Sequence, residues 1–175
     1  MADEVGLAQL TLAALAERLG VRQPSLYKHI DSMADLHRSI SLQAKRESGE
    51  VLVRAAVGRS GGDAIRAMSH AYRTWALQHP ARYQAAQTMP TPGDAEGETA
   101  SLEVVRIISD VLVAFELQGD DAVDAVRAFR ATLHGFVALE AEGGFALSAS
   151  VDRSFERLIH GYTVALATWT EPFER

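Results

Sequence analysis

Apolar residues recur at helical spacing along almost the whole chain, and this periodicity constrains the fold more than any other feature of the sequence. Between residues 11 and 19, one face of the expected helix is apolar at the i, i+3, i+4, i+7 spacing. Its members are Leu12, Leu15, Ala16 and Leu19. No stretch alternates apolar and polar residues between turn signals, as a half-buried β-strand does. The sequence therefore predicts an all-α fold.

Glycines, prolines and capping residues divide the rest of the chain into longer helices. We expect helices over residues 32–58, 63–79, 102–117, 120–143 and 155–169. Asp63 is expected to cap the second of these helices, and Gly119 to end the third. Residues 89–99 contain two prolines, two glycines and three acids, which indicates an exposed loop.

Length and composition bound the class of protein. The 175 residues fit one core, or one core with a small appendage. The absence of cysteine excludes a disulfide scaffold, thiolate-bound zinc and a cysteine nucleophile. No apolar run reaches the roughly 18 residues of a membrane span, and the acidic start of the chain shows no signal peptide. We therefore expect a globular, cytoplasmic protein without membrane association.

Residues 10–30, LTLAALAERLGVRQPSLYKHI, form the most informative stretch of the chain. Thr11 is a good N-cap for a first short helix, and Pro24 is expected at the first position of a second one, where its missing N–H costs nothing. Between them, Gly20 suits a turn with positive φ, and Ala16 is small where the two helices cross. These constraints predict a helix-turn-helix, whose second helix enters the major groove of DNA by its N-terminal residues.

The outward side chains of that second helix suit contact with DNA. Arg22 and Lys28 can meet phosphates or guanine edges. Hydrogen-bonding groups are provided by Gln23, Ser25, Tyr27 and His29. The alternative interpretation is a capped helical hairpin with a solvated polar face.

The charge of the chain is unevenly distributed. Taken whole, the formal charge of -6 disfavours nucleic acid as a partner. Residues 1–46, however, hold six basic and five acidic side chains, which leaves eleven of the 17 basic and eighteen of the 23 acidic residues for the remainder. Only the N-terminal segment therefore avoids repelling DNA. We expect a helix-turn-helix domain over residues 1–46 and a second domain over residues 47–175.

The same N-terminal residues carry a family resemblance. Leu10–Leu12, Leu15–Val21 and Ser25–Ile30 resemble the DNA-binding domain of the tetracycline-repressor (TetR) family. Further along the chain, Leu133–Gly135 and Glu142–Phe145 resemble a ligand-domain subgroup named for a Trp-His-Gly motif, with leucine in place of the tryptophan.

This resemblance implies a homodimeric one-component repressor that an unidentified small molecule releases from double-stranded operator DNA. Thr11 and Tyr27 match positions at which the family contacts phosphates. The positions that match the recognition helix are Arg22, Gln23, Pro24, Ser25, Lys28 and His29. Met33 stands where the family usually has a lysine, so one phosphate contact is expected to be missing or to come from the backbone alone.

The resemblance also implies a full first helix beneath the helix-turn-helix. Residues 1–6 look like the last turn of that helix, with Gly6 as its C-cap. On this basis the sequence predicts a DNA-binding domain that lacks most of its first helix. The alternative function is then a dimeric small-molecule-binding or interaction module without DNA binding.

Small residues mark the last two long helices as the expected homodimer interface. Gly135 lies on one of these helices, and Gly161 and Ala165 lie on the other, where they allow close approach of a partner. The alternative is that these helices only pack inward.

A small-molecule site is expected where aromatic, sulfur and polar side chains gather in the second domain. Its candidate residues are Met68, Tyr72, Trp75, Phe115, Phe129, His134 and Phe136, with Tyr83 and Met89 at the entrance. The same residue types at helical spacing also fit a plain core. A charged ligand would require Arg127, Arg130 or Glu140 to turn inward.

Motifs of catalysis are missing from the sequence. There is no Gly-x-Ser-x-Gly elbow, His-Glu-x-x-His pair, Walker-type phosphate loop or dinucleotide fingerprint, and no two of the six histidines stand at i, i+4. We therefore expect no enzymatic activity, no cofactor and no metal site.

Overall fold

The computed structural model describes residues 1–170, and this part of the chain contains helices and no strands, which confirms the all-α prediction. Residues 171–175 of the predicted second domain lie outside the described residues. Two 3-10 turns occupy Leu7–Gln9 and Val113–Phe115. The α-helices are α1 (Ala2–Val5), α2 (Leu12–Leu19), α3 (Gln23–Leu26), α4 (Met33–Ala56), α5 (Gly61–Gln78), α6 (Pro80–Ala86), α7 (Ala95–Leu112), α8 (Gly119–Ala141) and α9 (Val151–Ala167).

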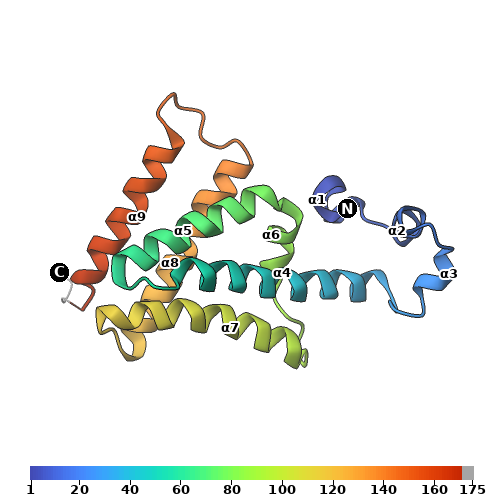
Figure 1. Ribbon diagram of the computed structural model, residues 1–175, viewed down its shortest axis with the longest axis horizontal. Coiled ribbons are helices and arrows are strands. Elements are labelled where there is room, and N and C mark those ends of the chain that lie inside the picture. The colour runs from blue at the N-terminus through green and yellow to red at the C-terminus, as the bar shows by residue number, and fades with distance from the viewer. Residues whose placement is uncertain (171–175) are drawn as a thin grey trace.

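α4 joins a small N-terminal group of helices to a larger helical body (Figure 1). We call α2, α3 and the first turn of α4 the head, and α5 to α9 with the rest of α4 the body. The predicted domain boundary at residues 46 and 47 falls inside α4. Gly49 brings α7 close to α4, because a Cβ at this position would lie 3.3 Å from Cδ1 of Ile107. None of the helices described is long and apolar enough to cross a membrane.

Local capping and a small apolar core hold the head together. The Thr11 hydroxyl accepts a hydrogen bond from the Ala14 amide at 3.1 Å and so caps α2, as predicted. Gly20 ends α2 in the left-handed region, with φ of 67°. The buried core residues of the head are Leu12, Ala16 and Leu26, with Leu15, Ile30, Met33 and Leu36 packed against them.

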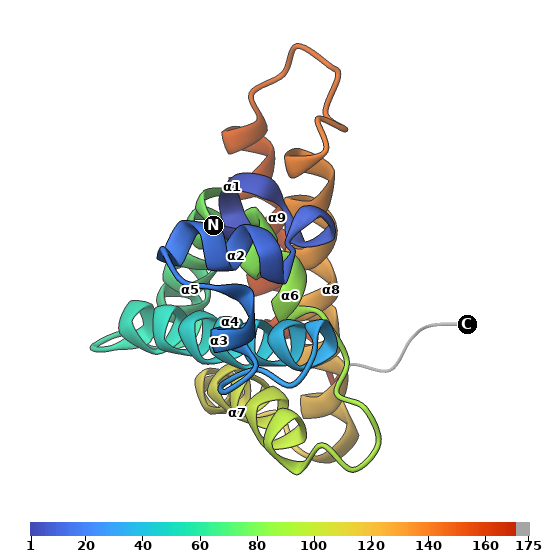
Figure 2. The same cartoon turned by 90° about the vertical axis from the view of Figure 1, so that its right-hand side faces the viewer.

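The core of the body draws on α4, α5, α7, α8 and α9. Its centre includes Phe129 of α8 and Phe155 of α9, which are both fully buried. Tyr162 of α9 packs against the Phe129 ring and donates a hydrogen bond from its hydroxyl to the Ala125 carbonyl at 2.9 Å. α8 and α9 run side by side along the edge of the body, as Figure 2 shows.

Two predicted helix starts are wrong by one to three residues. α5 begins at Gly61 with Ser60 at its N-cap, so Asp63 lies in the first turn instead of capping the helix. Pro24 occupies the second position of α3 and not the first, because Arg22 is the N-cap. Both shifts are within one turn, where several residues satisfy the same backbone requirements.

The predictions around α7 are wrong in more detail. The loop expected over residues 89–99 ends at Asp94, because this side chain accepts a hydrogen bond from the Gly97 amide at 3.0 Å and starts α7. α7 stops at Leu112, and Gly119 opens α8 instead of closing the preceding helix. The turn between α7 and α8 uses Glu116 in the left-handed region, with φ of 58°.

Truncating a fully buried ring is expected to destabilise the body. Phe155→Ala leaves a cavity among α8, α9 and Phe136, so the free energy of unfolding should fall by about 3–5 kcal/mol. Denaturant unfolding followed by tryptophan fluorescence measures this change. The control Val113→Ala, at a side chain that is 68% exposed, should stay within about 0.5 kcal/mol of the wild type. Equal effects of the two substitutions would contradict the assigned core.

Candidate functional site

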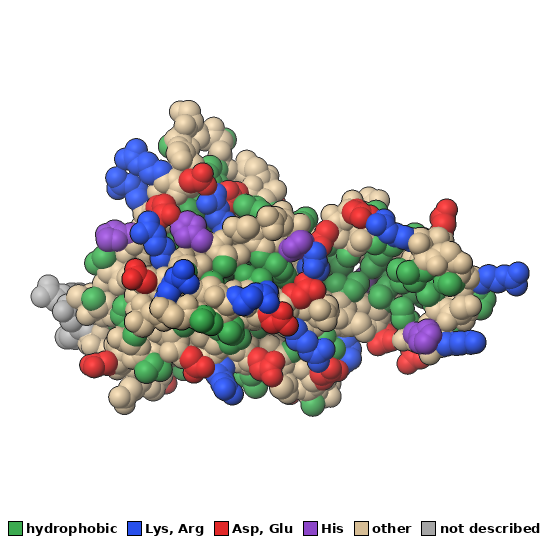
Figure 3. All heavy atoms as spheres, in the orientation of Figure 1, with side chains coloured by type: hydrophobic (Ala, Val, Ile, Leu, Met, Phe, Trp, Pro, Cys, Tyr) green, Lys and Arg blue, Asp and Glu red, His purple; other side chains and the backbone are tan. Residues whose placement is uncertain are grey.

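The head presents a polar surface around α3. Leu26 is the one side chain of α3 that is buried, and it anchors the helix on α2. The residues predicted to contact DNA are exposed on this end of the molecule, where Figure 3 shows basic and histidine side chains at the right-hand tip. They are Thr11, Arg22, Gln23, Pro24, Ser25, Tyr27, Lys28 and His29.

Two cations of this surface are free of carboxylates within residues 1–170. Neither Arg22 nor Lys28 forms an ion pair in this part of the chain, whereas Arg18 on the neighbouring helix is held by Glu4 in a two-pronged pair. The hydrogen bonds from Arg18 lower the pKa of Glu4. Arg22 and Lys28 are thus the cations of the head that can pair with an external anion without breaking an internal contact.

α1 bridges the head and the body. Its Asp3 carboxylate accepts hydrogen bonds from the backbone amides of Ala81 and Arg82 at the start of α6, both at 3.0 Å, and from Nε of Arg82 at 2.6 Å. Burial would raise the pKa of Asp3, but the hydrogen bonds from Arg82 outweigh it and hold the pKa below its usual value. Arg82 also donates to Glu47 on α4 at 2.8 Å. The three elements α1, α4 and α6 are therefore joined by one network.

A second network ties α4 to the start of α7. Arg38 donates to both oxygens of Asp94, at 2.6 and 3.0 Å, and to Glu96 at 3.0 Å, while Arg46 reaches Glu96 at 2.7 Å. The hydrogen bond from Arg38 lowers the pKa of Asp94, and those from Arg46 and Arg38 lower that of Glu96. Asp94 thus serves both as the N-cap of α7 and as the anchor of α4.

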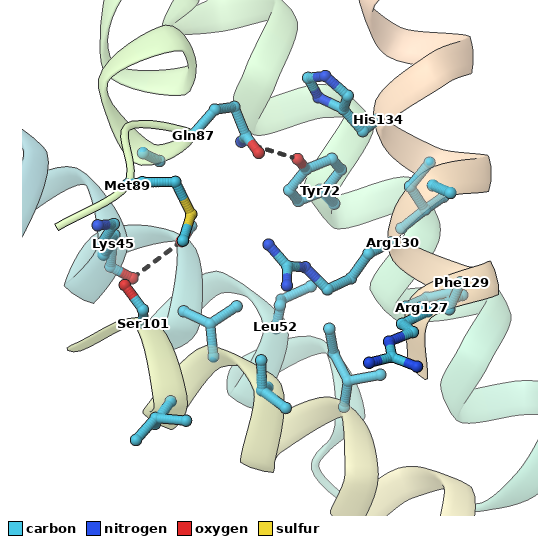
Figure 4. Close-up of a pocket in the computed structure, with 18 of the residues that line it drawn as sticks. Lys45, Leu52, Tyr72, Gln87, Met89, Ser101, Arg127, Phe129, Arg130 and His134 are labelled. Atoms are coloured by element: carbon cyan, nitrogen blue, oxygen red, sulfur yellow. Dashed lines mark hydrogen bonds between the residues drawn. The ribbon is translucent and has the colours of Figure 1, made fainter. Parts of the chain in front are cut away.

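A cavity of about 510 Å³, open to solvent on one side, lies between α4, α7, α8 and the segment that joins α6 to α7 (Figure 4). Its wall is mostly apolar, with Leu52 from α4, Ile108 from α7 and Phe129 from α8. Met89 and Leu102 lie at its rim and are largely exposed. A volume of this size lies within the range of about 300–1,000 Å³ that is usual for small-molecule sites.

Polar groups reach the cavity from several elements. Gln87 donates from Nε2 to the Tyr72 hydroxyl at 3.3 Å, as Figure 4 shows. Burial raises the pKa of Tyr72, so this hydroxyl stays protonated. Lys45 donates from Nζ to the Thr88 carbonyl at 2.8 Å. Burial lowers the pKa of Lys45, against the opposing effect of the Asp94 charge.

The structure divides the predicted ligand-binding residues into two groups. Tyr72, Phe129 and His134 line the cavity, together with Met89 and with the two arginines of α8, Arg127 and Arg130. The residues placed elsewhere are Met68, Trp75, Phe115 and Phe136, which pack in the apolar clusters of the body, Tyr83, which hydrogen-bonds His134, and Glu140, which pairs with Arg73. Helical periodicity identifies the inward side of a helix but not where packing leaves a gap.

Sequence reasoning missed Lys45 as a cavity residue. This side chain is 6% exposed and lies between Leu42 and Leu52 on the buried face of α4. Its spacing of three and seven residues from these leucines is the signal that could have found it, since a lysine at such a position has to enter the interior.

Small residues lie on the outer faces of α8 and α9. A Cβ added at Gly135 or Gly161 would meet no atom within 4 Å, so the surface beside both glycines is open. Ala165 and Val164 are exposed on α9 as well. Among residues 1–170, no group of three or more histidine, aspartate or glutamate side chains is arranged to hold a metal ion.

The chain thus has a helix-turn-helix head joined by one long helix to a helical body with a cavity, an arrangement typical of the helical transcriptional regulators. A family profile described as "Tetracyclin repressor-like, C-terminal domain" matches residues 65–162, more than half of the chain. The chain belongs to the tetracycline-repressor (TetR) family. The subgroup named for a Trp-His-Gly motif stays a prediction.

Individual relatives agree with this assignment. The HTH-type transcriptional regulator Rv0681 of Mycobacterium tuberculosis is 39% identical over 142 residues, which are 81% of this chain and 65% of that protein. The regulator YobS of Bacillus subtilis is 29% identical over 146 residues, 83% of this chain and 75% of that protein. A TetR variant from Acinetobacter baumannii AYE, solved in complex with minocycline, has the same fold, with a TM-score of 0.72 at 21% identity over 98% of this chain and 92% of that one. This chain therefore covers less than two thirds of the length of the Mycobacterium tuberculosis relative Rv0681.

Protonation of Asp94 is expected to weaken the link between α4 and α7. Because the pKa of Asp94 is lowered in the folded chain, its contribution to stability is present above the ordinary carboxyl pKa of about 4 and is lost as the pH falls through the folded value. Asp94→Asn keeps a capping side chain but removes the charge. Its free energy of unfolding should therefore fall less between about pH 7 and pH 3 than that of the wild type, as urea titrations measure.

The matched control is Asp110→Asn, at an exposed carboxylate 3.9 Å from Arg106 on α7. Its dependence on pH should run parallel to that of the wild type. A parallel curve for Asp94→Asn as well would show that the Arg38 contact contributes nothing to the folded state.

Proposed function

We propose that this chain is a ligand-responsive, DNA-binding regulator of transcription, a repressor that a small molecule releases from its operator. The observation that carries the proposal is the exposed pair Arg22 and Lys28 beside α3, which meets no carboxylate within residues 1–170, on a head that α4 connects to a cavity. The proposal includes no catalysis, cofactor or metal.

In this proposal the N-terminus of α3 enters the major groove. Arg22, Gln23, Pro24 and Ser25 are the first residues to reach the bases, and Lys28 and His29 follow on the same exposed surface. Tyr27 directs its hydroxyl to a phosphate, which its exposure of 52% allows. Thr11 faces the same backbone while its hydroxyl caps α2, so its loss would affect the fold and the contact together.

α4 transmits the state of the cavity to the head. Lys45 and Leu52 line the cavity, and Met33 and Leu36 at the other end of the same helix pack into the head core. Asp94, which follows the segment that borders the cavity, holds α4 through Arg38. A ligand that moves this segment therefore displaces α4, and with it the orientation of α3.

Two copies of the chain associate through α8 and α9, with Gly135, Gly161 and Ala165 at the contact. The open surface beside both glycines supports this interface, since a second pair of helices can approach closely there. A two-fold dimer presents two copies of α3 to two half-sites, so a displacement of α4 changes the spacing between them.

Substitutions on the α3 surface are expected to separate phosphate contacts from base contacts. Lys28→Ala and Tyr27→Phe should weaken binding on all sequences, with the salt slope for Lys28→Ala falling by about 1. Gln23→Ala and His29→Ala should relax specificity, at about 1–3 kcal/mol for each lost base contact. Fluorescence anisotropy with the DNA that flanks the gene, and with a scrambled duplex, measures both effects at stated salt.

Arg106→Gln on α7 is the control, because this arginine is exposed and far along the chain from the head. It should leave affinity and salt slope unchanged. If the wild type shows no preference for the flanking DNA over the scrambled duplex, the regulator proposal fails, and a small-molecule-binding module without DNA binding becomes the better interpretation.

A charge placed on the proposed dimer face is expected to separate the two copies. Gly161→Arg fits the open surface of a single chain but would meet the partner's helices, so the dimer should dissociate. Sedimentation velocity at micromolar concentration measures the change, with Thr74→Arg on the exposed side of α5 as the control that stays dimeric. A monomeric wild type would rule out this interface.

A further inference from the structure

We propose that the cavity takes a small molecule that combines an apolar body with an anionic head group, a carboxylate or a phosphate monoester, and that Arg130 binds this head group. The inference rests on the proposed function, in which the cavity holds the effector, and it narrows the effector to one chemical class.

The first support is the sign of the charges around the cavity. Its lining within residues 1–170 includes Lys45, Arg127 and Arg130 and no aspartate or glutamate. The whole chain has 23 acidic and 17 basic side chains, so a wall with bases alone departs from the average composition. An anion inside the cavity would meet no carboxylate at its wall.

The second support is the state of Arg130. Figure 4 shows its side chain reaching from α8 into the cavity, toward Tyr72. It pairs with no carboxylate among residues 1–170, whereas Arg127, one turn earlier, donates to Asp124 at 3.2 Å. The inward-facing Arg73 is likewise paired, with Glu140. A guanidinium presents a planar fork of donors that matches a carboxylate or a phosphate.

Further donors surround the same space. The Tyr72 hydroxyl accepts its hydrogen bond from Gln87 and keeps its own proton free to donate. Lys45 uses one of three protons on the Thr88 carbonyl, so two are left for a ligand. The donors thus come from α4, α5 and α8, and all three residues line the cavity. Arg130 and Tyr72 lie on the same side of it, as Figure 4 shows.

The rest of the wall selects the apolar body. Leu52, Val105, Ile108 and Phe129 provide aliphatic and aromatic surface, and Met89 and Leu102 extend it to the rim at 81% and 66% exposure. A neutral apolar molecule would cover this wall but form no ion pair with the Arg130 guanidinium. A small inorganic anion would leave the apolar wall uncovered.

Isothermal titration calorimetry of the full chain with decanoate, decyl phosphate and decanol tests the inference. At least one of the two anions is expected to bind once per chain and at least about tenfold more tightly than decanol, because only the anions add an ion pair with the Arg130 guanidinium to the hydrogen bond that a hydroxyl can also accept. The stronger of the two anions identifies the head group. Equal affinity for decanol and both anions, or no binding of any of them, would overturn the proposal.

Arg130→Gln is expected to lower the affinity for the preferred anion by about tenfold or more and to leave that for decanol within about twofold. Arg130→Lys keeps the positive charge, so its affinity for the anion should lie between those of Arg130→Gln and the wild type. Such an intermediate affinity would show that the loss in Arg130→Gln does not come from a general defect in folding. Arg106→Gln, outside the cavity lining, is the matched control and should bind like the wild type. Unchanged anion binding by Arg130→Gln would overturn the assigned role.

DNA binding measured on the same samples separates this inference from the proposed function. Charge-dependent anion binding by a chain that shows no sequence preference on DNA would support the inference and defeat the regulator proposal. Sequence-specific DNA binding by a chain that binds none of the three probes would support the regulator proposal and overturn the inference about the anion. Release of DNA by the preferred anion, lost in Arg130→Gln, would support both.

Discussion

One continuous helix, α4, contributes to both ends of the molecule, and the rest of the structure depends on its position. Its first turn supplies Met33 and Leu36 to the head core, and its second half supplies Lys45 and Leu52 to the cavity wall. The close contact between α7 and α4 at Gly49 restricts lateral movement of α4. In the proposed function, a displacement of α4 at the cavity therefore reaches the head through the same helix.

Ion pairs determine which cations of the chain are available to external partners. The pair of Arg38 with Asp94 holds α4 to α7, the pair of Arg82 with Asp3 holds α6 to α1, and the pair of Arg73 with Glu140 holds α5 to α8. The cations outside these networks include Arg22 and Lys28 on the head and Arg130 in the cavity. In a chain with a formal charge of -6, such cations can attract an anion, which in the proposed function is DNA phosphate at the head and a small molecule in the cavity.

Much of the fold could be predicted because it depends on contacts between residues close in sequence. The cap at Thr11, the left-handed turn at Gly20 and the buried Leu26 each follow from chemistry within one or two helical turns. The errors arose where two local signals compete: Gly119 looks like the end of a helix, but the chain turns already at Glu116 and the glycine opens α8. Propensity alone does not decide between such neighbours.

The candidate cavity depends on contacts between residues far apart in sequence. Periodicity indicated that Tyr72, Phe129 and Trp75 face inward, but tertiary packing buried Trp75 in a cluster with Tyr83 and left space beside the other two. Arg127 and Arg130 are one turn apart on α8, but Arg127 pairs with Asp124 of the same helix, whereas Arg130 forms no ion pair within residues 1–170 and reaches into the cavity. The helical type of the elements, the order of the long helices and the turn of the head follow from the sequence, because capping and amphipathicity are local, whereas the short α6 was not predicted. The position of the cavity and the freedom of Arg130 follow from how α4, α5, α7 and α8 pack, because a gap between helices is a property of all of them together.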